Sequence, residues 1–378
     1  MDPASEAANV APPAGGPRPP DWLRELASVG LVVAVVATMP TWLNSVGFVT
    51  LSDGVIAGIY TMLAVGLVLV IGYCGQISLA SNAFFGMGGY GSAILVSHSI
   101  LEPWAALVAS AVATGLFAAV VGVLVFRLRG HLLAVATLAV GYVAYLIFVT
   151  ASITGGANGT DAGPGLSVAG TRLVGDRSYY YVAWIGAFVC LVLSRNLVRS
   201  RTGRALRAVQ TSEAAAEASG VHPVIYKIVA FTVAAMMGSL AGSIYADYVG
   251  FVAPSSFNIL LTVEILVMAV VGGLKSVWGA PFGVLFVLGL NGALQTYLPE
   301  VVHIQPTYFS TIGFGVALIV FLLVLPGGLG DGASRLWQQA ANLVAAHTAG
   351  SEPEKVARVD SAANTPPVEQ AATGGGGE

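Results

Sequence analysis

The stretch that decides the fold is residues 54–101, GVIAGIYTMLAVGLVLVIGYCGQISLASNAFFGMGGYGSAILVSHSIL, 48 residues without an Asp, Glu, Lys or Arg. A helix needs about 20 mostly apolar residues to span a bilayer, so this run is too long for one crossing. Glycines and polar residues interrupt it from Gly72 to Gln76. The stretch therefore predicts two crossings, near residues 54–72 and 80–98. The second is rich in Gly, Ser and Asn, which also suits a re-entrant or broken helix.

The whole chain has the composition of a membrane protein. Charged residues make up 9% and apolar residues 56% of its 378 residues, and the mean hydropathy is +0.80. A soluble domain carries about 25% charged residues. These values exclude an ordinary cytosolic enzyme, a nucleic-acid-binding protein and a disulfide-stabilised secreted domain. The charge-free runs predict an all-α polytopic membrane protein with about ten transmembrane helices, near residues 26–44, 54–72, 80–98, 103–126, 131–150, 179–195, 227–248, 259–274, 279–298 and 308–326.

The distribution of Lys and Arg predicts the orientation, because short cytoplasmic loops carry an excess of both. If the N-terminus is inside, 14 of the 16 basic residues fall on the cytoplasmic side and two, Arg172 and Arg177, fall outside. Both termini are therefore expected in the cytoplasm. The 14 are Arg18, Arg24, Arg127, Arg129, Arg195, Arg199, Arg201, Arg204, Arg207, Lys227, Lys275, Arg335, Lys355 and Arg358.

The two ends differ from the apolar middle of the chain. Residues 1–22 are rich in proline and are expected to be disordered. The transmembrane domain is expected over 23–330. Residues 331–378 are expected to form an amphipathic helix on the inner membrane surface, in contact with lipid, followed by a disordered, glycine-rich tail.

Polar residues inside expected crossings are candidates for a transport path. Gln76, Ser78 and Asn82 follow the interruption in the long apolar run, and Glu264 lies five residues into a later segment. Polar groups at membrane depth need partners, and ionisable ones are usually functional. The alternative for the first three is tight helix packing through small residues. Glu264, which lies in the outer half of its segment, is alternatively hydrogen-bonded, protonated or snorkelling toward the surface.

The longest expected cytoplasmic loop is 195–226. Its composition predicts a short helix over 203–219 that ends at Gly220, before Pro223. The small side chains of this helix allow another protein to approach closely. The alternative is a solvated connector whose arginines only reflect the positive-inside bias.

Several kinds of chemistry are missing from the sequence. There is no G-x-x-x-x-G-K-[ST] phosphate-binding loop and no H-E-x-x-H motif, and the five histidines are scattered. We therefore expect no enzymatic activity, no catalytic residues, no metal site and no cofactor bound by this chain.

Three stretches together resemble the permeases of branched-chain amino acid ABC transporters, of the LivM type. They are Gly72–Leu79 with Ala83–Tyr90, Arg201–Val209 with Ser212–Val221, and Gly250–Phe257 with Val263–Gly273 and Gly279. Two departures stand out. Ala80-Ser81 occupies a place where the family usually has Gly-His, which leaves the substrate open. In the importer motif Glu-Ala-Ala-x-x-x-Gly, residues Ala215, Ala216 and Gly220 fit, but the Glu position holds Ala214 and Glu213 lies one residue early.

The resemblance implies a multi-pass subunit of an ATP-driven importer in the bacterial inner membrane. Its partners would be a second permease subunit, two ATPase subunits that use ATP and a periplasmic substrate-binding protein, with no nucleic acid. The helix at 203–219 would be the coupling element, through Glu213, Ala215, Ala216 and Gly220. The substrate would be a branched-chain amino acid or, alternatively, another amino acid, an amide or urea. A secondary transporter that works without ATP and a membrane scaffold without a substrate are alternatives from other classes.

Overall fold

The computed structural model describes residues 38, 50–128, 131–168, 171–302 and 315. The chain divides into two units, residues 1–330 and 331–378, and every described residue belongs to the first. The expected crossings at 26–44 and 308–326 lie outside the described residues except for Thr38 and Gly315, as do both termini and the expected surface helix.

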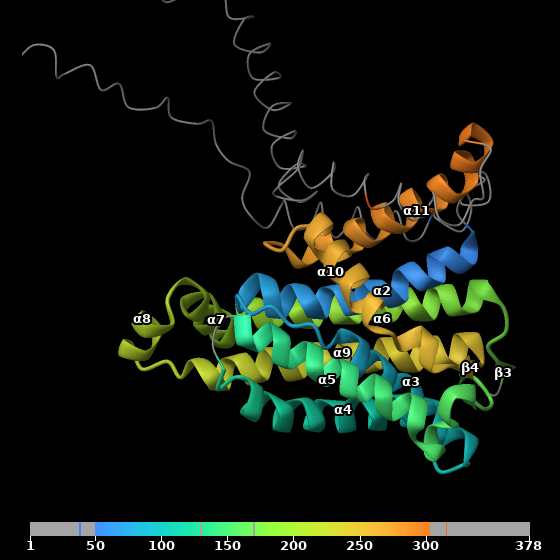
Figure 1. Cartoon of the computed structure of the whole chain (residues 1–378), viewed down its shortest axis with the longest axis horizontal. Coiled ribbons are helices and arrows are strands. Elements are labelled where there is room, and N and C mark those ends of the chain that lie inside the picture. Colours follow the sequence, from blue (N-terminus) through green and yellow to red (C-terminus); the bar gives the residue numbers. More distant parts are fainter. Residues whose placement is uncertain (1–37, 39–49, 129–130, 169–170, 303–314, 316–378) are drawn as a thin grey trace, which may run out of the picture. The chain divides into compact units, whose positions relative to one another are not determined.

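The described part is almost entirely helical (Figure 1). The long helices are α2 (Leu51–Val68), α3 (Ser81–Ser97), α4 (Pro103–Val125), α5 (His131–Thr150), α6 (Asp176–Arg199), α9 (Pro223–Val249), α10 (Ile259–Gly272) and α11 (Ala280–Val302). Two short helices, α7 (Arg201–Thr211) and α8 (Glu213–Ala218), lie between α6 and α9. A π-helix, η2 (Leu69–Tyr73), continues α2, and 3-10 turns form η3 (Ser152–Thr154), η4 (Gly156–Asn158), η5 (Pro254–Phe257) and η6 (Val277–Gly279).

Four two-residue strands form two antiparallel pairs. They are β1 (Thr160–Asp161), which pairs with β4 (Phe251–Val252), and β2 (Ser167–Val168), which pairs with β3 (Thr171–Arg172). These strands lie in the connections and form no core of their own.

Six helices in the described part are long and apolar enough to cross a membrane. They are Leu51–Tyr73, Pro103–Val125, Leu132–Thr150, Asp176–Arg199, Pro223–Val249 and Val277–Thr296. These six match expected crossings, which confirms the helical membrane class. The expected crossings at 80–98 and 259–274 correspond to the shorter helices α3, of 17 residues, and α10, of 14.

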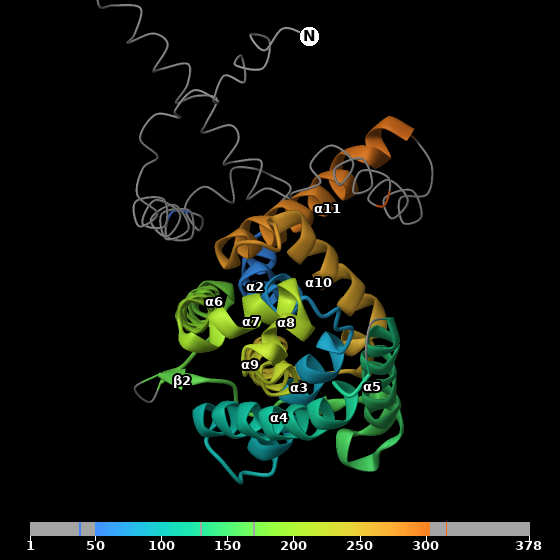
Figure 2. The ribbon, with the colours of Figure 1, turned by 90° about the vertical axis from the view of Figure 1, so that its left-hand side faces the viewer.

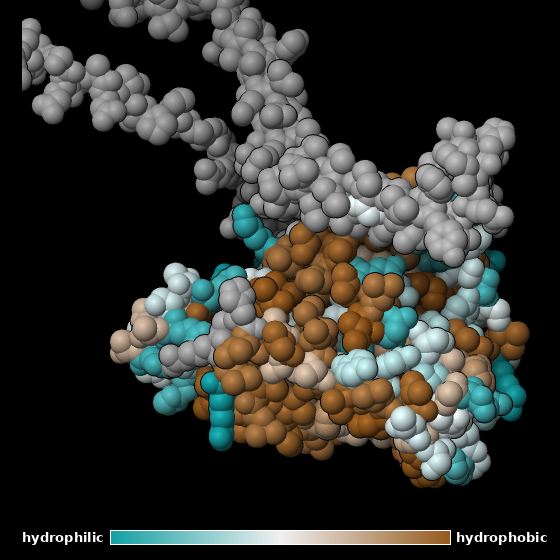
Figure 3. All heavy atoms as spheres, in the orientation of Figure 1, coloured by the Kyte–Doolittle hydropathy of each residue, from teal (hydrophilic) through white to brown (hydrophobic). Residues whose placement is uncertain are grey.

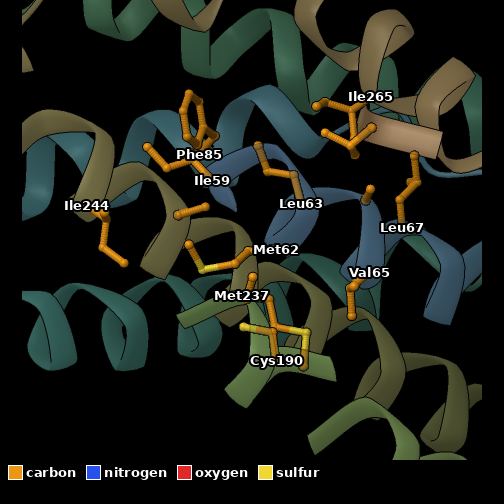
Figure 4. Close-up of a cluster of buried hydrophobic side chains, with 14 of the residues drawn as sticks. Ile59, Met62, Leu63, Val65, Leu67, Phe85, Cys190, Met237, Ile244 and Ile265 are labelled. Carbon is orange, nitrogen blue, oxygen red and sulfur yellow. The ribbon is translucent and has the colours of Figure 1, made fainter. Parts of the chain in front are cut away.

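Helix α2 and its continuation η2 form the centre of the bundle, because 83% of their 18-residue apolar stretch is buried inside the protein. It packs against α6, α9, α10 and α11, while α3 packs against α9, α4 and α5. Figure 2 shows this arrangement from one end. Figure 4 shows where side chains of five helices meet, with labels on Ile59, Met62, Leu63, Val65, Leu67, Phe85, Cys190, Met237, Ile244 and Ile265.

Small residues bring the helix backbones together. A Cβ at Gly242 of α9 would collide with the carbonyl oxygen of Phe85 in α3, and a Cβ at Gly58 of α2 would lie 2.9 Å from the Cβ of Ala183 in α6. Small residues at i and i+4 allow such close crossings. The contacts between these helices therefore depend on residues that have almost no side chain.

The two ends of the bundle carry different elements (Figure 1). Helices α7 and α8 lie at one end, and β3 and β4 lie at the other. Eight described basic residues lie in or beside the elements at the α7–α8 end, namely Arg127, Arg195, Arg199, Arg201, Arg204, Arg207, Lys227 and Lys275. Arg172 and Arg177 belong to β3 and the first turn of α6 at the other end. Figure 3 shows hydrophobic residues across the face between these ends.

Candidate functional site

The expected third crossing, called the broken crossing below, begins as an unwound segment rather than as a continuous helix. After η2, the chain is non-helical from Gly75 to Ala80 and becomes helical again at Ser81. Gly75 has φ +70°, in the left-handed region that favours glycine. Helix α2 ends at the α7–α8 end and α3 runs toward the β4 end, so the unwound residues and α3 together lead from one end of the bundle toward the other.

The unwound segment and the first turn of α3 each obtain a hydrogen bond from another helix. The amide of Leu79 donates to Oγ1 of Thr137 in α5 at 3.0 Å, and the amide of Asn82 donates to Oγ1 of Thr262 in α10 at 3.0 Å. Irregular backbone at membrane depth is tolerated only where protein or water satisfies it. The break in the third crossing is therefore held by two threonines that are far away in the sequence.

Asn82 joins three helical regions. Its side chain is fully buried, and its Nδ2 donates to the carbonyl oxygens of Gly141 at 3.1 Å and Phe257 at 3.2 Å. Its Oδ1 accepts a hydrogen bond from Oγ1 of Thr262 at 3.1 Å. Both amide hydrogens and the carbonyl oxygen of this side chain are thus engaged by the protein itself. These contacts favour the packing alternative for Asn82.

Ser78 and Ser81 line a small cavity of about 20 Å³, which is enough for one water molecule. The other lining residues come from α2, η2, α3 and α9, and are Leu63, Gly66, Leu67, Val70, Phe84, Phe231, Ala234 and Gly238. Ser78 is 5% exposed. The cavity thus combines two hydroxyl-bearing residues with an apolar wall, at the junction of the central helix and the broken crossing.

The four candidate path residues do not form one cluster. Gln76 is half-buried in the unwound segment, beside the exposed Ile77. Glu264 is half-buried on α10, where it lies close enough to Tyr60 of α2 to interact electrostatically, and it does not line the cavity. Of the four candidate residues, only Ser78 lines the cavity. Asn82 lies where α3 is hydrogen-bonded to α10 through Thr262.

The loop between α6 and α9 contains two helices where the sequence predicted one over 203–219. The backbone of Ser212 is extended, with φ −160° and ψ 116°, and its Oγ accepts a hydrogen bond from the amide of Ala215 at 3.3 Å. Serine is a strong N-cap because its side chain satisfies an amide that has no helical partner. Ser212 therefore ends α7 and begins α8.

The four residues expected to couple to an ATPase have different surroundings. Ala216 is buried against the protein itself and is 3% exposed, whereas Ala214 and Ala215 are exposed. Gly220 is exposed with φ +81° and open space around it, so it serves the turn after α8. The exposed residues of α8 are therefore Ala214, Ala215, Glu217 and Ala218.

Glu213 forms an ion pair that the sequence did not reveal. Its Oε1 lies 2.5 Å from Nζ of Lys227 in α9, whose side chain is only 4% exposed. The pair fastens the first turn of α8 to the second turn of α9, and Glu213 is engaged within this chain. The pair could not be predicted from the sequence, because the two residues are 14 positions apart on different helices.

Long apolar helices around a central one, a broken crossing and a fastened helix pair at one end define a polytopic membrane transport protein. Residues 54–325 match the family described as "Branched-chain amino acid transport system / permease component", and the chain belongs to that family. It is thus the permease component of an ABC transport system and not an enzyme.

Similar proteins include both kinds of permease from these systems. The chain is 29% identical over 326 residues to the high-affinity branched-chain amino acid transport system permease LivM of Escherichia coli K12, covering 79% of this chain and 74% of that protein. It is 26% identical over 288 residues to LivH of Salmonella typhimurium, covering 71% of this chain and 90% of that protein. No solved structure matches the chain.

Proposed function

We propose that this chain is one of two different permease subunits in an ATP-driven importer of the bacterial inner membrane, and that it translocates branched-chain amino acids. The observation that carries the proposal is the α7–α8 pair, which is fastened to one end of the bundle and presents exposed alanines outward. The names of the similar LivM and LivH permeases support the choice of substrate class and of two unlike permeases. ATP would be hydrolysed on separate subunits, and a periplasmic protein would deliver the substrate.

The ATPase contact is expected on the exposed side of α8. Small side chains let a helix approach a partner closely, and a charge placed in such a contact would be buried without a partner. We therefore expect Ala215→Glu to weaken copurification of the ATPase subunits and to lower uptake, while the permease remains inserted. Ala216→Glu is not a clean test, because Ala216 is buried inside this chain.

A matched control is Ala157→Glu, which changes an exposed alanine in η4 at the opposite end of the bundle. It is expected to leave ATPase binding unchanged. If Ala215→Glu retained both full uptake and ATPase binding, the loop would be a solvated connector, and transport without ATP would become the better explanation.

The path for the substrate is proposed beside the unwound segment, past Gln76 and Ser78 and between α2 and α9. The cavity there has room for no more than one water molecule, so an amino acid requires these elements to separate. Gln76→Leu is expected to reduce uptake without reducing insertion, because it removes a polar group next to the path. Wild-type uptake in this variant would place the path elsewhere.

The substrate class is tested with the complete assembly in proteoliposomes. ATP-dependent uptake of radiolabelled L-leucine, L-isoleucine and L-valine is expected, with little uptake of L-glutamine, acetamide or urea. Preferred uptake of one of the last three would keep the importer and replace the substrate. Uptake that needs no ATP would contradict the importer itself.

A further inference from the structure

One residue of α7 contacts the turn that opens the broken crossing. Nε2 of Gln210 donates a hydrogen bond to the carbonyl oxygen of Gly72 at 2.8 Å. Cγ of the same side chain lies 3.1 Å from the position that a Cβ of Gly75 would occupy. Gln210 therefore touches both ends of the segment Gly72–Gly75.

Helix α7 is attached firmly to the bundle beside this contact. Leu206 and Val209 are buried, at 0% and 2% exposure. Nη2 of Arg207 donates to the carbonyl oxygen of Val198 at 2.9 Å, which ties α7 to the last turn of α6. The Glu213–Lys227 pair holds the following helix. A force applied to α8 therefore reaches α7 as part of one connected unit.

The turn is also held from its other side. The hydroxyl of Tyr73 donates to the carbonyl oxygen of Lys275 at 3.0 Å, and a Cβ at Gly72 would collide with the carbonyl oxygen of Leu274. The turn thus lies between α7 and the loop that follows α10. Its first two residues, Gly72 and Tyr73, are the last two of the π-helix η2, a form that is rare in proteins and is frequent at functional positions.

We propose that Gln210 is a positioning residue that transmits movement of the α7–α8 pair to the unwound segment 75–80. The contact is direct on the Gly72 side, and the chain continues from Gly75 to Ser78 at the cavity and to the first turn of α3. The inference rests on the proposed function, because it assumes that ATP-driven force enters through α8. The inference adds the contact through which that force reaches the broken crossing.

The test is Gln210→Met in the complete assembly, reconstituted with both permeases, the ATPase subunits and the binding protein. Methionine keeps the length and packing of the side chain but cannot donate to Gly72. Two rates are measured, ATP hydrolysis and uptake of radiolabelled L-leucine. We expect the substrate imported per ATP hydrolysed to fall about five-fold, the factor that corresponds to one net hydrogen bond. ATPase copurification and basal hydrolysis are expected to stay at wild-type levels.

Thr211→Val is the matched control. Thr211 is the exposed neighbour of Gln210, and its hydroxyl bonds only to the carbonyl oxygen of Arg207 within α7, at 3.0 Å. This variant is expected to import as much substrate per ATP hydrolysed as the wild type does. Gln210→Glu, which also lacks the donor at neutral pH, is expected to behave like Gln210→Met.

Two results would overturn the proposal. In the first, Gln210→Met imports as much substrate per ATP as the wild type. In the second, Gln210→Met loses ATPase copurification or membrane insertion in the same proportion as it loses import, which would make Gln210 a stabilising residue only. The wild-type assembly separates this question from the proposed function, because a wild type that imports none of the six candidate substrates with ATP contradicts the importer before any variant is compared.

Discussion

Replacing Asn82 by leucine separates the two roles that its sequence position allows. Leucine has the same branching as asparagine, with two methyl groups in place of the amide oxygen and nitrogen, and it forms no hydrogen bonds. If Asn82 joins helices, the variant loses stability. If Asn82 lines a transport path, the variant loses uptake without losing stability.

The expected magnitude follows from the bonds that are removed. The side chain of Asn82 engages Gly141, Phe257 and Thr262. Hydrogen bonds between membrane helices contribute about 0.6 kcal/mol each, so Asn82→Leu should lower the free energy of unfolding by about 2 kcal/mol. Thr262→Val removes two bonds to Asn82 and should cost about 1.2 kcal/mol. Because one bond is shared, the double variant should fall short of additivity by about 0.6 kcal/mol.

The assay is the unfolding of the purified subunit in mixed micelles titrated with dodecyl sulfate, for the wild type, both single variants and the double variant. Uptake is measured in parallel and expressed per folded molecule, where we expect Asn82→Leu to remain close to the wild type. An unchanged free energy of unfolding combined with lost uptake would refute the packing role and place Asn82 in the path.

Three further predictions concern topology, packing and charge. In intact cells, an impermeant thiol reagent applied from outside should label Ala157→Cys and not Ser212→Cys, and the reverse pattern would invert the proposed orientation. Gly242→Leu should destabilise the subunit by about 1–3 kcal/mol through overpacking. Gly289→Leu should be nearly neutral, because nothing lies within 4 Å of the position that its Cβ would occupy. Equal losses of stability in the two variants would rule out the helix contact as the cause. Glu213→Ala should cost about 1–3 kcal/mol by leaving the buried Lys227 ammonium unpaired. Adding Lys227→Met should restore part of that loss, and no recovery would show that the ion pair is not responsible.

The sequence predicts the membrane helices well because lipid imposes a length and a composition on each crossing. The charge-free runs locate the six long helices, and the interruption from Gly72 to Gln76 marks the break before α3. The end of α7 was also visible in principle, since Ser212 is followed by an acidic residue and alanines, as at many helix starts.

The contacts of individual side chains could not be predicted in the same way. The partners of Asn82 lie 59, 175 and 180 positions away, so its role depends on how α5, η5 and α10 come together. Likewise, the burial of Ala216 depends on how α8 docks on α9, because every alanine of a six-residue helix looks alike in the sequence. Gln210 carried no signal, being one polar residue in a helix whose small residues were the ones expected to make contacts.

The break in the third crossing has a consequence for how the protein is made. The threonines that satisfy the amides of Leu79 and Asn82 belong to α5 and α10, which leave the ribosome after α3. Since unpaired backbone groups are costly in lipid, we expect α3 to settle in the bilayer only after α5 and α10 have been synthesised. A cysteine at Ser97 is therefore expected to stay unlabelled from outside in a nascent chain that stops at residue 128, and to become accessible once the chain extends beyond α10.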